Sequence, residues 1–216
     1  MTVSDKFYDE IVEVLQKHQP KLKAISSPNT IEISGVYVCK GPMGEFDQFD
    51  INISVPRDYP IAEPEVREVG GRIPHTVARH IYPSTAKCCL GHWVVWLLNS
   101  ESHSFESYLL GHLASYFIGQ SVFELTGEWP FGEEGHSKSE IATSYREALG
   151  LTERADAVAF TRLLSSPLLR GNPYCPCGSG DRLKSCHWSK LRALRQRFPP
   201  AIRKLIYKRV YERAEK

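Results

Sequence analysis

The chain has 216 residues, of which 42% are hydrophobic and 24% are charged, and its formal net charge is +2. These proportions are ordinary for a soluble globular protein, and the length suits one sizeable domain with an appendage. No apolar stretch approaches the ~20 residues that a membrane-spanning helix needs, and the polar N-terminus lacks the pattern of a secretory signal. We therefore expect a cytoplasmic protein with no membrane partner.

Basic residues are concentrated at the C-terminus. Residues 190–216 contain ten Lys or Arg against two Glu, whereas the rest of the chain contains 17 basic and 23 acidic residues. Such a tail can attract nucleic acid or an acidic partner surface, but a solvated helix face accounts for the same residues. No base-stacking pattern is interleaved with these cations, so nothing in the tail selects nucleic acid.

The first 69 residues predict a helix followed by an antiparallel meander. Apolar residues at helical spacing predict an amphipathic helix over residues 3–18, with Pro20 beyond its end. Alternating apolar and polar residues predict three strands, over residues 30–40, 46–55 and 65–69. Residues 56–64 contain three prolines, which cannot donate to a sheet ladder, so they predict a rigid turn.

The rest of the chain is predicted to be mainly helical. Residues 93–98 are apolar, and residues 105–125 carry apolar side chains at helical spacing, which predicts a buried helix. Glycines and a proline predict a loop over residues 127–136, and two shorter helices are expected at 141–149 and 155–164. The whole order predicts an α+β fold in which residues 137–170 form a helical linker.

A histidine and two adjacent cysteines follow the third predicted strand. A thiolate is a strong nucleophile, so His80, Cys88 and Cys89 are candidates for a catalytic site. Lys87, His80 or His92 could favour the thiolate if the fold brings one of them close to it. Two small buried thiols at a strand end are the alternative explanation of the pair.

The most specific motif lies near the C-terminus. Cys175, Cys177, Cys186 and His187 occur within thirteen residues, and thiolate and imidazole are the ligands that zinc prefers in closed tetrahedral sites. The segment is too short to bury a core of its own, so a structural Zn(2+) ion would supply its folding free energy. Four protein ligands leave no open coordination position, which argues against a catalytic metal. A reduced cysteine-rich loop without metal is the alternative.

This motif resembles the SEC-C zinc motif. Cys-Pro-Cys-Gly-Ser-Gly at residues 175–180 is followed by Cys-His at 186–187, and the resemblance covers residues 172–190. It implies that the two pairs bind one zinc, in a zinc module over residues 171–216 that includes the basic helical tail. The motif is an appendage of many bacterial proteins and does not identify its host. Arg182 and Lys184 suggest docking on an acidic surface.

Residues 1–136 resemble ubiquitin-conjugating enzymes. The predicted helix and strands are joined to a proline turn of the form Pro-x-x-Tyr-Pro-x-x-x-Pro at residues 56–64, and a Cys-Leu pair follows. The chain resembles even more strongly the bacterial relatives of these enzymes that occur in conjugation systems, including CBASS antiphage operons. The features shared with them occur in the same order: Arg72-Ile73-Pro74, His80, Cys89-Leu90-Gly91 and the loop 131–136 that ends in His136.

The resemblance implies a UBC-like fold and the activity of a thioester carrier. Cys89, rather than Cys88, precedes the expected Leu-Gly and would accept the C-terminus of a protein modifier or a nucleotidyltransferase as a thioester. It would then pass that group to an amine, and a separate activating enzyme would load it. The likeness to CBASS systems implies a role in bacterial antiphage conjugation.

The chain departs from the family pattern where an oxyanion donor is expected. Eukaryotic members carry His-Pro-Asn, whereas His80-Ile81-Tyr82 stands here. His80, Tyr82, His136 or a backbone amide would have to stabilise the oxyanion, and a structural role is the alternative for either histidine. The missing asparagine also favours a second function, a non-catalytic UBC-fold binding module or zinc-dependent docking protein. A third possible function is that of a cysteine hydrolase that uses Cys89 with His80 or His136.

Overall fold

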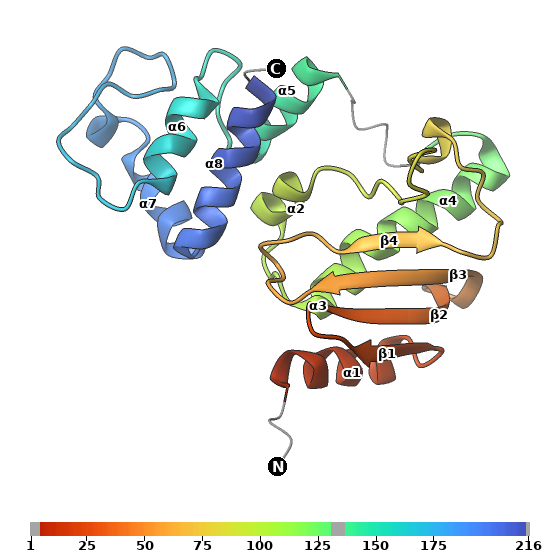
Figure 1. Cartoon of the computed structure of the whole chain (residues 1–216). Coiled ribbons are helices and arrows are strands. Elements are labelled where there is room, and N and C mark those ends of the chain that lie inside the picture. Colours follow the sequence, from red (N-terminus) through yellow and green to blue (C-terminus); the bar gives the residue numbers. More distant parts are fainter. Residues whose placement is uncertain (1–4, 131–136, 215–216) are drawn as a thin grey trace. The chain divides into compact units, whose positions relative to one another are not determined.

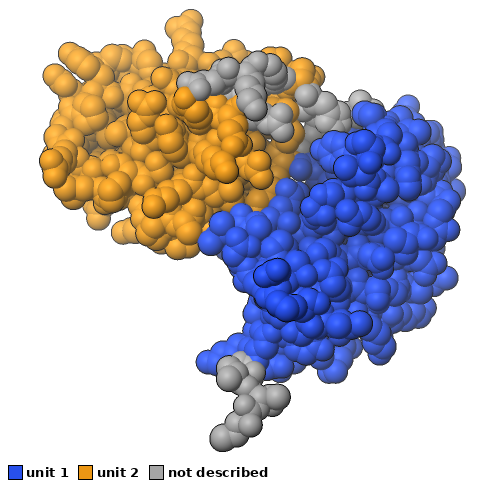
Figure 2. Space-filling model, viewed as in Figure 1, with its two compact units in different colours: residues 1–91, 100–133 blue, residues 92–99, 134–216 orange. Residues whose placement is uncertain are grey.

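The computed structural model of the chain describes residues 5–130 and 137–214. It forms two compact units, shown in different colours in Figure 2. Unit 1 contains residues 1–91 and 100–133, and unit 2 contains residues 92–99 and 134–216. The predicted α+β class is confirmed, because an N-terminal helix and an antiparallel sheet precede a series of helices. Among the described helices, none is both long enough and apolar enough to cross a membrane.

Unit 1 is built on a four-stranded antiparallel meander with the order β1-β2-β3-β4. Its strands are β1 (Leu22–Ser26), β2 (Thr30–Gly41), β3 (Gly44–Pro56) and β4 (Glu65–Glu68). The prediction of three strands is therefore wrong, since β1 adds a fourth beside β2. This strand has five residues and only Leu22 is fully buried, so its sequence carries no visible alternation.

Apolar side chains on one face of the sheet form the core of unit 1. Ile33 pairs with Ile53, which pairs in turn with Val66, and all three side chains are buried. Helix α4 (Ala114–Thr126) crosses this face, behind the strands in Figure 1. The Phe117 ring centroid lies 5.2 Å from that of Tyr37 and 4.9 Å from that of Phe49. Aromatic pairs at these distances stabilise a core beyond the area that they bury.

Helix α1 (Lys6–His18) packs beside β1 at the edge of the sheet (Figure 1). Asp5 caps its N-terminus by accepting a hydrogen bond from the Tyr8 amide, as N-cap residues do. At its other end the buried side chain of Gln19 donates to the Val38 carbonyl and accepts from the Val38 amide, both at 2.9 Å. These two bonds fix the end of α1 against β2.

The predicted helix at 105–125 is present, but its first part is not a regular α-helix. It consists of α3 (Phe105–Ser107), a π-helical segment (Tyr108–Leu113) and α4, which ends at Gly127 with a φ of 77°. The proline turn between β3 and β4 contacts its start, where the Tyr59 hydroxyl donates to the Ser104 carbonyl at 3.1 Å. The turn contains a cis peptide bond between Tyr59 and Pro60.

Unit 2 is helical and contains both the predicted helical linker and the predicted zinc module. Its helices are α2 (Trp93–Asn99), α5 (Lys138–Ala148), α6 (Ala157–Ser165), α7 (Trp188–Arg197) and α8 (Pro200–Ala214). Helix α8 packs against α5 and α6 around the buried Phe160 and Ile206. The Arg197 guanidinium donates to the carbonyls of Leu97 and Leu98, which ties α7 to α2.

Candidate thiol site and candidate metal centre

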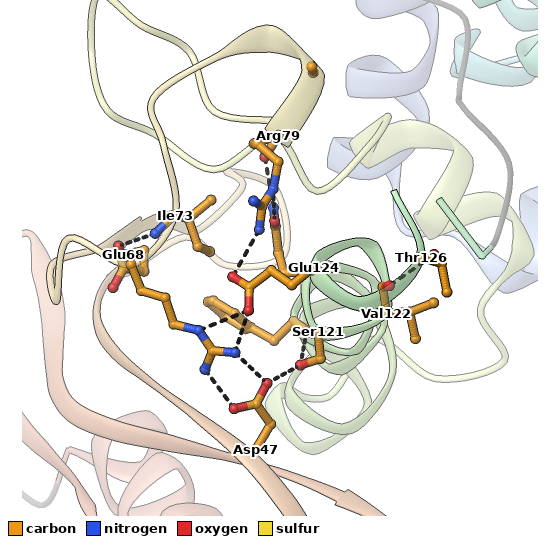
Figure 3. Close-up of polar contacts among 12 residues, drawn as sticks. Asp47, Glu68, Ile73, Arg79, Ser121, Val122, Glu124 and Thr126 are labelled. Atoms are coloured by element: carbon orange, nitrogen blue, oxygen red, sulfur yellow. Dashed lines mark hydrogen bonds and ion pairs between the residues drawn. The ribbon is translucent and has the colours of Figure 1, made fainter. Parts of the chain in front are cut away.

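The segment that leads from β4 to the predicted thiol site is held by charged side chains (Figure 3). The Arg72 guanidinium donates to Asp47 on β3 at 2.6 Å and to Glu124 on α4 at 2.5 Å. Arg79 donates to Glu124 at 3.1 Å and to Gln120 at 2.9 Å. The network lowers the pKa of Asp47, chiefly through its hydrogen bond from Arg72. These contacts fix residues 72–79 against the sheet and α4.

Residues 80–89 fold back on themselves in a short hairpin, which we call the thiol hairpin. Ile81 forms an antiparallel bridge with Cys88, and the Cys89 amide donates to the His80 carbonyl at 2.7 Å. The Cys88 amide donates to the Val66 carbonyl at 2.8 Å, so the hairpin is attached to β4. His80 adopts a φ of 48°, in the left-handed region where the chain turns sharply.

The two cysteines of the thiol hairpin have different surroundings. Cys88 is buried, and burial raises the pKa of its thiol to about 11. Cys89 is half-buried, and the Tyr82 hydroxyl donates a hydrogen bond to its Sγ at 3.4 Å. Neither forms a disulfide. Adjacent residues of an extended chain point to opposite sides, which explains why only one thiol enters the core.

The other predicted site residues lie in distinct places. The His80 ring lies nearly perpendicular to the Trp129 indole, with ring centroids 4.4 Å apart, and the His80 carbonyl accepts a hydrogen bond from the Tyr116 hydroxyl at 3.3 Å. The Lys87 ammonium forms an ion pair with Glu65, and the hydrogen bond from Lys87 lowers the pKa of that carboxyl. The ring of His92, in unit 2, packs 6.2 Å from that of Tyr145.

His136 lies outside the described residues, as does the whole segment 131–136. Tyr116 and Trp129 were missed by the sequence reasoning. They come from distant positions and only long-range folding brings them to His80, so no local pattern could have revealed them.

The four predicted metal ligands come together in unit 2. The ligand atoms of Cys175, Cys177, Cys186 and His187 all lie within 4.8 Å of one another. His187 Nδ1 is 3.3 Å from Cys175 Sγ and 3.0 Å from Cys186 Sγ, and Cys177 Sγ is 3.5 Å from Cys186 Sγ. Tetrahedral zinc spaces sulfur and nitrogen ligands by about 3.5–3.8 Å. The cluster therefore could bind a metal such as zinc, after a small expansion.

A short hairpin over residues 172–187, which we call the metal hairpin, holds these ligands. The Cys175 amide donates to the Asp181 carbonyl at 2.7 Å, and Gly178 and Gly180 adopt φ values of 82° and 83° at the turn. The Ser179 hydroxyl lies 3.3 Å from Cys177 Sγ, and this hydrogen bond lowers the pKa of the Cys177 thiol to about 6. Burial raises the pKa of the neighbouring Cys175 thiol to about 11, and metal binding would deprotonate both thiols because the metal binds the thiolate.

Comparisons with protein families, with curated proteins and with solved structures give no match. The fold and the two sites thus define the class to which the chain can be assigned. It is an α+β protein with a four-stranded antiparallel sheet, C-terminal helices and a Cys3His cluster that could bind a metal.

Proposed function

We propose that the chain is a ubiquitin-conjugating-like carrier with a UBC-like fold in unit 1. It accepts a protein C-terminus as a thioester on Cys89 and transfers it to an amine, in bacterial antiphage conjugation of the CBASS type. The observation that carries the proposal is the position of Cys89, a half-buried thiol beside a phenol hydroxyl on a hairpin fixed to the sheet. Its neighbour Cys88 is buried, which favours Cys89 as the thiol that a large partner reaches.

The chemistry requires two acyl transfers and no redox step. The Cys89 thiol first gives up its proton, and the thiolate attacks the carbonyl carbon of a thioester on a separate activating enzyme. The tetrahedral oxyanion collapses, the old carbon–sulfur bond breaks, and the enzyme's sulfur leaves as a thiolate. An amine then attacks the new thioester and loses a proton to water or a base, and Cys89 leaves as a thiolate. The acyl group is the C-terminus of a protein modifier or of a nucleotidyltransferase.

In the proposed carrier, the Tyr82 hydroxyl stabilises negative charge on and beside the Cys89 sulfur. Its hydroxyl can donate to the thiolate before attack and to the oxyanion that forms next to the same sulfur. It stands in the His-Ile-Tyr segment, two residues after His80, where eukaryotic relatives have asparagine. The tyrosine thereby takes the role that the asparagine would have had.

Replacing Tyr82 by phenylalanine is expected to slow transfer from Cys89 by about tenfold. Removing a buried oxyanion donor costs roughly 10²–10³ in rate, and Tyr82 is 51% exposed, so the loss should be smaller. The rate of adduct formation under single-turnover conditions measures the effect. Tyr174→Phe, which removes an exposed hydroxyl in unit 2, is the matched control and should leave the rate unchanged.

In the proposed carrier, the metal hairpin is a SEC-C module that holds a structural zinc. Zinc bound by Cys175, Cys177, Cys186 and His187 would hold the hairpin folded and take no part in acyl transfer. Lys204, on the exposed face of α8, and the other cations of the basic tail would contact an acidic partner surface.

A second candidate function is a non-catalytic module that holds a partner's tail. The observation in its favour is that the Lys87 ammonium is paired with Glu65. That pairing takes up a cation which could otherwise have favoured the Cys89 thiolate.

Thiol alkylation of the full chain separates the two functions without any partner. With N-ethylmaleimide at about pH 8, we expect Cys89 to react at least roughly tenfold faster than Cys88 or Cys39. Burial raises the pKa of the Cys88 thiol to about 11 and that of Cys39 to about 12, so both stay protonated and shielded at this pH. Peptide mapping by mass spectrometry gives the three rates. A Cys89 as slow as Cys88 is inconsistent with a carrier and favours the binding module.

A further inference from the structure

The metal hairpin presents one aromatic side chain to solvent. Tyr174 forms an isolated antiparallel bridge with Arg182, and the Leu183 amide donates to the Pro173 carbonyl at 2.8 Å. The backbone on both sides of Tyr174 is thus tied to the opposite strand of the hairpin. Its side chain nevertheless remains 65% exposed. A large aromatic ring that is rigidly mounted and exposed is available to a ligand.

Arg182 covers one face of this ring. Its guanidinium carbon lies 4.1 Å from the centroid of the Tyr174 ring, and the same group donates to the Asn172 carbonyl at 3.2 Å. The guanidinium is therefore held in place by a cation–π contact and a hydrogen bond. Since one face of the ring is occupied and most of the side chain is exposed, the opposite face is open to solvent.

Cations without acidic partners flank the stack in the sequence. Residues 170–192 contain five Lys or Arg and a single Asp. Arg170, Arg182, Lys184 and Arg192 are exposed. None of these four is paired with a carboxylate of the described residues. Lys184 lies close to the stack in the fold, because its amide donates to Asn172 Oδ1 at 2.9 Å.

We propose that this surface binds single-stranded nucleic acid. One base stacks on the open face of Tyr174, and Arg182, Lys184 and Arg170 contact the adjoining phosphates. Single-strand binding without sequence preference combines an aromatic platform with a positively charged track, and both are present here. An acidic protein surface would use the cations but would gain nothing from a flat, cation-stacked ring. The exposed tyrosine is what favours nucleic acid over an acidic protein.

The test measures binding of the full, metal-loaded chain to a labelled oligo(dT) of about 12 nucleotides by fluorescence anisotropy. Tyr174→Leu is expected to weaken binding roughly tenfold, whereas Tyr174→Trp, which keeps a stacking face, should bind as tightly as the original chain. Lys184→Gln should reduce the slope of log K against log salt by about 0.7. Lys21→Gln, at an exposed position in unit 1, is the charge control and should leave the slope unchanged.

Three results would overturn the proposal. The first is no detectable binding of the oligo(dT) by the metal-loaded chain. The second is unchanged affinity of Tyr174→Leu when its metal content is full, since that content shows that the hairpin has folded. The third is binding of poly-glutamate that is as tight as that of oligo(dT) and is unaffected by Tyr174→Leu, which would assign the surface to an acidic protein.

Discussion

Replacement of Cys177 by serine is expected to reduce the bound metal from about one ion per chain to nearly none, and to unfold the metal hairpin. Within this hairpin Leu183 is the one apolar side chain, other than the cysteines, that is buried. So little apolar surface cannot offset the loss of chain entropy. Structural zinc supplies about 10–16 kcal/mol of apparent binding free energy to segments of this size. Loss of one thiolate should remove most of it.

Unfolding of the metal hairpin should also destabilise the rest of unit 2. The Asp156 amide, at the start of α6, donates to the Pro176 carbonyl at 2.8 Å, and the Phe160 ring packs 6.3 Å from that of His187. Unfolding the hairpin removes both contacts, so we expect a lower Tm for unit 2. Atomic absorption measures the bound metal, and thermal melting measures the Tm. Ser185→Ala, an exposed position in the same hairpin, is the matched control. A Cys177→Ser chain with full metal content would refute the assigned ligand set.

Replacement of Cys89 by alanine is expected to abolish the thioester adduct completely. The remaining thiols should not substitute, because Cys39 and Cys88 are buried and the other three belong to the Cys3His cluster that could bind a metal. Cys89→Ser is the more informative variant, because it changes the chemistry of the adduct. A serine hydroxyl can accept the same acyl group as an oxygen ester, which thiol reductants do not cleave. The original chain should therefore give a reductant-sensitive adduct, and Cys89→Ser a slower-forming, reductant-resistant one.

Electrophoresis with and without reductant, on tagged chains expressed in their native host, gives the result. Cys88→Ala is the control, since it removes the adjacent thiol and should leave the adduct in place. If Cys88→Ala loses the adduct and Cys89→Ala keeps it, the nucleophile is Cys88. If both single variants keep it, neither cysteine is the carrier.

Local patterns predicted most of the fold. The alternation around Ile33 and Ile53 identified β2 and β3, because a sheet buried on one face imposes a period of two on its sequence. Strand β1 was missed because an edge strand of five residues, with little burial, is not required to alternate. The π-helical segment before α4 was also missed, since it arises from packing and leaves no periodic signal of its own.

The two sites differ in how far the sequence could predict them. The four candidate metal ligands are close in the chain and need only a tight hairpin to meet, so spacing and residue type were sufficient to predict that they cluster. The contact between Tyr82 and Cys89 depends on how the thiol hairpin folds, and Tyr82 was one of several candidate donors. The positions of Tyr116 and Trp129 beside His80 depend on the whole of unit 1.

Mass spectrometry of the purified chain shows whether Cys89 carries an acyl group. A tagged full chain is purified from its native host under acidic, non-reducing conditions, which preserve thioesters, and then digested and mapped. We expect a peptide that contains Cys89 joined through its sulfur to the C-terminal peptide of another protein, and we expect hydroxylamine or thiol to release that peptide. Recovery of Cys89 only as a free thiol, with an acyl group on a different residue, would contradict it.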